Sequence, residues 1–144
     1  MAQQLYWEDV QEGQDVPPYS QMVGYMELNR FAGANDELVP IHMDADYAKN
    51  VAKLPDVIVM GNLKLAYIAN AVTDWAGDEG WIEKLFIEYR KMDFVNHTLT
   101  AKAKVTKKYE RDSRHLVDLD VWVENDEGET TTPGRATLRL PSRQ

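Results

Sequence analysis

The final third of the chain alternates apolar and polar residues with a period of two. The apolar members of three such runs are Leu99, Ala101, Ala103 and Val105; Val117, Leu119, Val121 and Val123; and Ala136, Leu138 and Leu140. This alternation is typical of antiparallel strands that bury one face and leave the other in water. A further strand is predicted over residues 82–89, and segment 126–128 has the composition of a turn. We therefore expect four consecutive strands here.

A long helix is predicted immediately before these strands, over residues 62–76. Its apolar residues recur at spacings of three and four, which places one set on a common face: Leu65, Ile68, Ala69, Val72 and Trp75. Other apolar residues cover much of the remaining circumference, so the helix is expected to be buried on most sides. Gly61 opens this segment, and Gly77 is a suitable C-cap.

The N-terminal part is predicted to contain one strand and two short helices. The strand is expected over residues 19–28, the first helix over 30–34, and the second over 44–53 with Asp44 as its N-cap. Pro40 makes the segment between the two helices loop-like. This order of elements predicts an α+β fold in one domain over residues 1–144, with an antiparallel sheet wrapped around the long central helix.

Composition and charge exclude several classes of function. The 144 residues include no cysteine, which rules out disulfides, thiolate metal sites and a cysteine nucleophile. The formal net charge of -8 argues against nucleic-acid binding, because that depends on neutralising phosphates. No apolar run has the length of a membrane span or a secretory signal, so a cytoplasmic protein is expected. Histidines and carboxylates show no metal-like spacing, and we expect neither a metal nor a cofactor.

The middle of the chain carries a recognisable pattern. Residues 30–49, RFAGANDELVPIHMDADYAK, resemble the hydratase signature of MaoC-like proteins, with Pro40-Ile41-His42 and Asp44 matching its second half. Residues 54–81 resemble the central helix of that family and its lead-in, and their Thr-Asp-Trp-Ala-Gly ending at 73–77 is similar to an actinobacterial branch that includes hydratase subunits of steroid breakdown. The resemblance implies a hotdog fold and hydration or dehydration of an enoyl or (R)-3-hydroxyacyl thioester. It also implies coenzyme A or an acyl carrier as the thiol component.

The same resemblance implies a catalytic acid paired with His42. The family usually places its acid five positions before the histidine, which is Glu37 here, whereas a one-residue insertion would restore Asp36. Such a pair can share one water, activate it for attack at C3 and supply a proton to C2. The N–H of Gly61 at the start of the buried helix is expected to stabilise the thioester oxygen, with Asn62 as a second donor.

Each of these residues also has a purely structural interpretation. His42 can serve as a hydrogen-bonding loop residue, Asp36 as a turn residue, Glu37 as a solvated neighbour and Gly61 as a packing residue. A basic run, formed by Lys102, Lys104, Lys107 and Lys108, is either a solvated strand face or a dock for the phosphates of coenzyme A.

Two further functions compete with the hydratase hypothesis. The family often has Asn before the proline and His before the helix glycine, where this chain has Val39 and Met60. These differences favour a non-catalytic or partner-dependent subunit of a hydratase complex. A hotdog thioesterase is the other alternative, since one fold hosts several chemistries. In every case we expect a dimer, either a homodimer or a mixed complex with a second hotdog subunit, because an open sheet leaves an edge to be paired.

Overall fold

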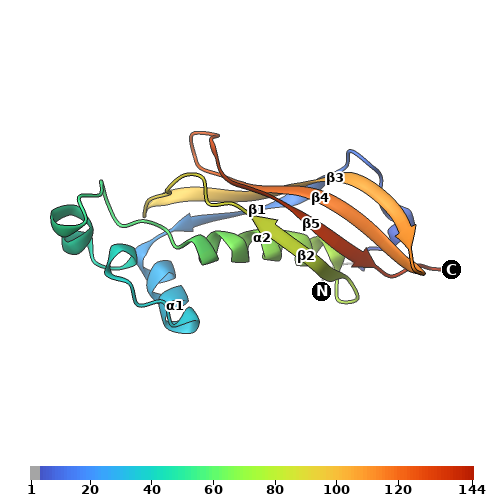
Figure 1. Ribbon diagram of the computed structural model, residues 1–144, viewed down its shortest axis with the longest axis horizontal. Coiled ribbons are helices and arrows are strands. Elements are labelled where there is room, and N and C mark those ends of the chain that lie inside the picture. The colour runs from blue at the N-terminus through green and yellow to red at the C-terminus, as the bar shows by residue number, and fades with distance from the viewer. Residues whose placement is uncertain (1–3) are drawn as a thin grey trace.

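The computed structural model describes residues 4–144. Its strands are β1 (Asp15–Val23), β2 (Trp81–Ile87), β3 (His97–Arg111), β4 (Arg114–Glu124) and β5 (Thr130–Leu140). Its longer helices are α1 (Tyr25–Asn35) and α2 (Gly61–Ala76), and its short helical segments are η1 (Trp7–Asp9), η2 (Pro40–His42) and η3 (Tyr47–Val51). The strands form one antiparallel sheet in the order β1-β3-β4-β5-β2, which curves over α2 (Figure 1).

The four strands predicted after the long helix are confirmed, and so are the buried faces of the three alternating runs. All eleven apolar residues named from the three alternating runs are at most 4% exposed, so these residues form the inner face of the sheet. β3 and β4 are joined by a tight turn whose two central residues, Asp112 and Ser113, both have positive φ. That geometry matches the right-handed twist of a hairpin.

The long helix is confirmed, but its buried face differs from the predicted one. Ile68 and Val72 are buried, whereas Leu65, Ala69 and Trp75 are only partly covered. The fully buried face is completed by Leu63, Lys64, Tyr67, Ala71 and Ala76. Periodicity did not single out this face because apolar residues cover much of the circumference of the helix. Gly77 ends the helix as expected, with its N–H bonded to the carbonyl of Thr73.

The predicted boundary between the first strand and the first helix is wrong. β1 ends at Val23, and α1 already begins at Tyr25, with Gly24 as its N-cap. The apolar residues after Gly24 favoured a longer strand, but the chain instead buries Leu28 and Ala32 on one side of a helix. α1 therefore extends to Asn35 and carries the following loop toward the start of α2.

The second short helix lies close to its predicted position. Asp44 Oδ1 accepts a hydrogen bond of 3.0 Å from the backbone N–H of Tyr47, and the chain then forms the π-helical segment η3. In Figure 1, α1 lies below the left-hand end of the sheet, near the start of α2, and η3 lies farther out, beyond the end of the sheet. Between residues 4 and 144 no helix combines the length and apolarity that a membrane crossing requires. The extent of a single domain over 1–144 stays a prediction.

Candidate functional site

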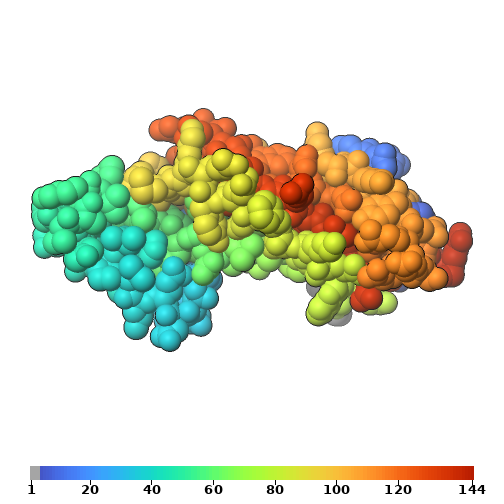
Figure 2. All heavy atoms as spheres, viewed as in Figure 1, coloured from blue at the N-terminus to red at the C-terminus, as the bar shows by residue number. Residues whose placement is uncertain are grey.

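A pocket of about 360 Å³ opens at the amino end of α2. It is formed where three segments meet: the loop after α1, the lead-in to α2, and the irregular chain that follows β2. The lining residues are Glu37, His42, Ile58, Val59, Gly61, Asn62, Lys64, Tyr89, Lys91 and Met92. Figure 2 shows the yellow segment that follows β2 at the surface, over the green residues of α2.

His42 is held against the lead-in of α2. The backbone N–H of Ile58 donates to the carbonyl of Ile41 over 3.1 Å, and the Nδ1 atom of His42 lies 2.8 Å from the carbonyl of Ile58. A carbonyl oxygen can only accept a hydrogen bond, so Nδ1 carries the proton in this contact. Nε2 of the neutral ring therefore has a free lone pair, as a proton acceptor requires.

Glu37 faces that lone pair. Its Oε1 atom lies 3.8 Å from His42 Nε2, too long for a direct hydrogen bond but short enough for one water to contact both atoms. Its Oε2 atom accepts a hydrogen bond of 2.9 Å from the amide of Asn35 and one of 3.5 Å from the amide of Asn62. The carboxylate is thus oriented from two sides, and its remaining oxygen points to the imidazole.

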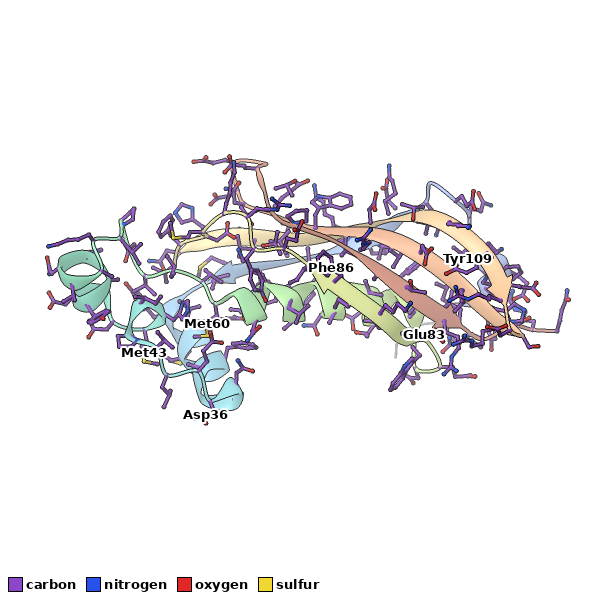
Figure 3. All side chains as sticks on the ribbon, in the orientation of Figure 1. Asp36, Met43, Met60, Glu83, Phe86 and Tyr109 are labelled. Atoms are coloured by element: carbon purple, nitrogen blue, oxygen red, sulfur yellow. The ribbon has the colours of Figure 1, made fainter. Side chains whose placement is uncertain are left out.

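Asp36 does not join this arrangement. It is the C-cap of α1, with a left-handed backbone (φ 52°, ψ 37°), and its side chain is exposed. Figure 3 shows it at the outer end of α1, away from Met60 at the start of α2. The left-handed residue reverses the chain direction, so the neighbouring side chains diverge. Of the two candidate acids, the structure brings Glu37 beside His42 and leaves Asp36 in solvent.

Gly61 and Asn62 form the first turn of α2 and line the pocket. Among residues 4–144, no acceptor lies within hydrogen-bond distance of either backbone N–H, as is usual at the start of a helix. The space beside the Gly61 Cα is filled by the ring of Tyr89, because a Cβ there would lie 2.6 Å from the ring. The Asn62 side chain links Glu37 to Tyr89, whose hydroxyl donates to its Oδ1 over 3.2 Å.

Tyr89 and Lys64 are among the lining residues that sequence reasoning did not assign to the site. Partial burial of the hydroxyl raises the pKa of Tyr89, and the negative charge of Glu37 raises it further, so this group stays a hydrogen-bond donor at neutral pH. Lys64 is buried under the pocket, paired with Asp93. A lysine on an otherwise apolar helix face was the available signal for Lys64, whereas Tyr89 lay at the end of a predicted strand with no distinguishing pattern.

The four lysines of the basic run on β3 all contact groups within the chain. Lys102 pairs with Glu124 and Lys104 with Asp15, while Lys107 and Lys108 lie over the rings of Tyr109 and Trp7. These contacts favour the interpretation as a solvated strand face. No group of three or more His, Asp or Glu side chains within the described residues is arranged to hold a metal ion.

Residues 10–127 match the family model of the MaoC like domain. Among solved structures, an (R)-hydratase from A. caviae involved in PHA biosynthesis is 22% identical, with a TM-score of 0.83 over 93% of this chain and 99% of that one. R-Hydratase PhaJ1 from Pseudomonas aeruginosa is 21% identical, with a TM-score of 0.87 over 97% and 88% of the two chains. The curated proteins contain no match.

A third structural neighbour is the ChsH1-ChsH2 complex from Mycobacterium tuberculosis, at 19% identity, a TM-score of 0.79, and 90% and 97% coverage. At these identities the neighbours establish the fold. The predicted hotdog architecture, an antiparallel sheet around a central helix, is therefore confirmed.

Proposed function

Because the chain belongs to the MaoC-like dehydratase family, we propose that it adds water to, or removes water from, an enoyl or (R)-3-hydroxyacyl thioester of coenzyme A or an acyl carrier. The family is one of hydro-lyases, and the prediction of a hydratase or dehydratase is confirmed at that level. The substrate, the residue roles and the assembly described below are parts of the proposal.

The observation that carries the proposal is the facing pair of Glu37 and His42 in the pocket at the amino end of α2. In the hydration direction, a water between them loses one proton to His42 Nε2 as its oxygen bonds to C3. Glu37 holds the second hydrogen of that water and stabilises the imidazolium. The proton on Nε2 then passes to C2, so that H and OH have been added and both side chains return to their starting states.

Charge develops on the thioester oxygen during this step. The free N–H groups of Gly61 and Asn62 support the assignment of that oxygen to the amino end of α2, where the helix dipole also favours negative charge. Asp36 has no part in this mechanism. It serves as the matched control for Glu37, since the two carboxylates are adjacent in sequence and differ in their surroundings.

The test is hydration of crotonyl-CoA by the purified chain. The reaction is monitored through the loss of the enoyl absorbance, and free thiol is measured in parallel. We expect turnover without thiol release, strong loss in His42→Ala and Glu37→Gln, and near wild-type rates in Asp36→Asn. Thiol release at the rate of substrate loss would identify a thioesterase instead. Retention of full turnover by both His42→Ala and Glu37→Gln would overturn the site assignment.

A second candidate, a partner-dependent hydratase subunit, is favoured by the exposed apolar residues around the pocket. Tyr89 and Met92 line it and are more than half exposed, and Leu38 beside Glu37 is 64% exposed. We propose that a second hotdog unit covers this rim, in a homodimer or a mixed complex. A lone chain that is inactive but gains turnover with a co-purified partner would support this candidate, and an active homodimer would support the first. The cytoplasmic location stays a prediction.

A further inference from the structure

The pocket is underlain by a buried ion pair. Lys64 is 2% exposed and Asp93 is 3% exposed, and Lys64 Nζ lies 2.9 Å from Asp93 Oδ2. The same ammonium donates to the carbonyl of Lys91 over 3.0 Å, and the hydroxyl of Thr131 donates to Asp93 Oδ2 over 2.7 Å. Asp93 Oδ1 is also buried, and no hydrogen-bond partner for it lies among residues 4–144.

Such a pair is a poor way to stabilise a fold. Taking two charges out of water costs several kcal/mol per ion, and apolar residues of similar volume often serve as well or better. Here the pair also leaves one carboxylate oxygen unsatisfied, and it occupies a helix face whose other buried residues are largely apolar. The pair therefore calls for an explanation beyond the stability of the core.

Its contacts point to the chain segment 88–93, which forms the outer wall of the pocket. Hydrogen bonds from the N–H groups of Glu88, Arg90 and Lys91 to the carbonyls of Pro133 and Thr131 tie this segment to β5. Lys64 ties the same segment to α2, through one backbone carbonyl and one side chain. The segment is thus held between the sheet and the helix.

Three residues of the segment line the pocket, Tyr89, Lys91 and Met92. The ring of Tyr89 rests on Gly61, and Lys64 Nζ lies 5.8 Å from the centre of that ring, within range of a cation–π contact. Loss of the ion pair would remove the two bonds from Lys64 and leave the Tyr89 ring held on α2 mainly by its hydroxyl bond to Asn62, so the ring could move outward.

We propose that Lys64 and Asp93 are positioning residues that hold Tyr89 against the amino end of α2 and thereby set the width of the acyl pocket. The inference rests on the proposed function in one respect, that an acyl thioester fills this pocket. The placement of Tyr89 by the buried pair is a claim about the free protein and does not depend on any activity.

The test uses Lys64→Met and Asp93→Val, singly and combined. Each single change leaves one buried charge unpaired, so the urea midpoint of unfolding should fall, whereas the double variant should return to the wild-type midpoint or exceed it. A nuclear Overhauser contact between the Tyr89 ring and the Gly61 α-protons should be strong in the wild type and weakened in the double variant. The ratio of kcat/KM for a long enoyl thioester to that for crotonyl thioester should rise at least about fivefold, mainly through KM.

Ile68→Val is the matched control, because Ile68 is buried on α2 and does not line the pocket. It should lower the urea midpoint slightly and leave the Overhauser contact and the chain-length ratio unchanged. A double variant that regains stability and keeps both wild-type readouts would overturn the proposal.

The Overhauser contact tests the positioning of Tyr89 even if the wild type has no hydratase activity or the double variant does not fold. Absence of hydratase turnover in the wild type would remove the proposed function, while the Overhauser contact would still decide whether the pair positions Tyr89. If the double variant does not fold, Asp93→Asn retains the shape of the side chain and removes its charge. That variant should weaken the same contact, and an unchanged contact would overturn the proposal.

Discussion

A comparison of Glu37→Gln with Asp36→Asn distinguishes the roles of the two carboxylates that are adjacent in the sequence. In the proposed mechanism Glu37 stabilises the imidazolium that forms on His42, across 3.8 Å. Two unit charges at that distance interact by about 4 kcal/mol at an effective dielectric constant of about 20. This corresponds to roughly a thousandfold in rate.

Glu37 is a quarter exposed, so solvent reduces this value. We expect Glu37→Gln to lower kcat for hydration by about 100-fold to 1,000-fold, within the usual range for general acid–base groups. KM should change little, because Gln retains the shape of the side chain. Asp36→Asn should remain within about twofold of the wild type, since an exposed side chain with no bonding partner among residues 4–144 contributes little.

The assay is steady-state hydration of crotonyl-CoA, with circular dichroism and urea unfolding to show that both variants are folded. A loss below about tenfold in Glu37→Gln would contradict the electrostatic argument. An equal loss in Asp36→Asn would show that the loop rearranges when substrate binds, and that the acid was assigned to the wrong residue.

Three further predictions concern Tyr89, Gly61 and the core of the sheet. The negative charge of Glu37 is one cause of the raised Tyr89 pKa, so Glu37→Gln should lower that pKa toward its ordinary value without reaching it, because the partial burial remains. Carbon NMR of the tyrosine ring would measure the shift, and an unchanged pKa would contradict the contact between the two side chains. Gly61→Ala should displace the ring of Tyr89, which lies 2.6 Å from the position of the new Cβ. The variant should have a raised KM with only a small change in the urea midpoint of unfolding. An undisturbed Tyr89 ring in the Overhauser spectrum would refute this prediction. Leu138→Ala should destabilise the fold by about 2–5 kcal/mol in urea unfolding, since Leu138 is fully buried in the sheet; a loss below about 1 kcal/mol would place it outside the core.

The sheet and the central helix were predictable because their patterns are local and regular. Leu99, Leu119 and Leu138 mark strands that each bury one face, and this alternation directly determines which side faces α2. The segment after Gly24 was mispredicted for the opposite reason. Its apolar residues suit a strand or a helix equally, and only the packing of Leu28 and Ala32 decides between them.

The candidate site was predictable in its residue types and its position along the chain. The spacing of Glu37 and His42, and the glycine at the start of a buried helix, were all present in the sequence. The choice between Asp36 and Glu37 could not be predicted from the sequence. It depends on the left-handed backbone of Asp36, where the chain turns so that one carboxylate lies outward and the other inward. Lys64 and Asp93, 29 residues apart, showed no pattern that would pair them.

The sequence by itself determined the order of the elements, the apolar faces that assemble the core, and the loop that carries an acid and a histidine toward the central helix. These properties follow from periodicity, turn residues and short motifs, all of which act over a few neighbouring residues. Only the tertiary structure decided which acid faces the histidine, what fills the space beside Gly61, and how a buried lysine is neutralised. Those outcomes depend on distances between segments remote in the chain, which arise only when the sheet closes over the helix.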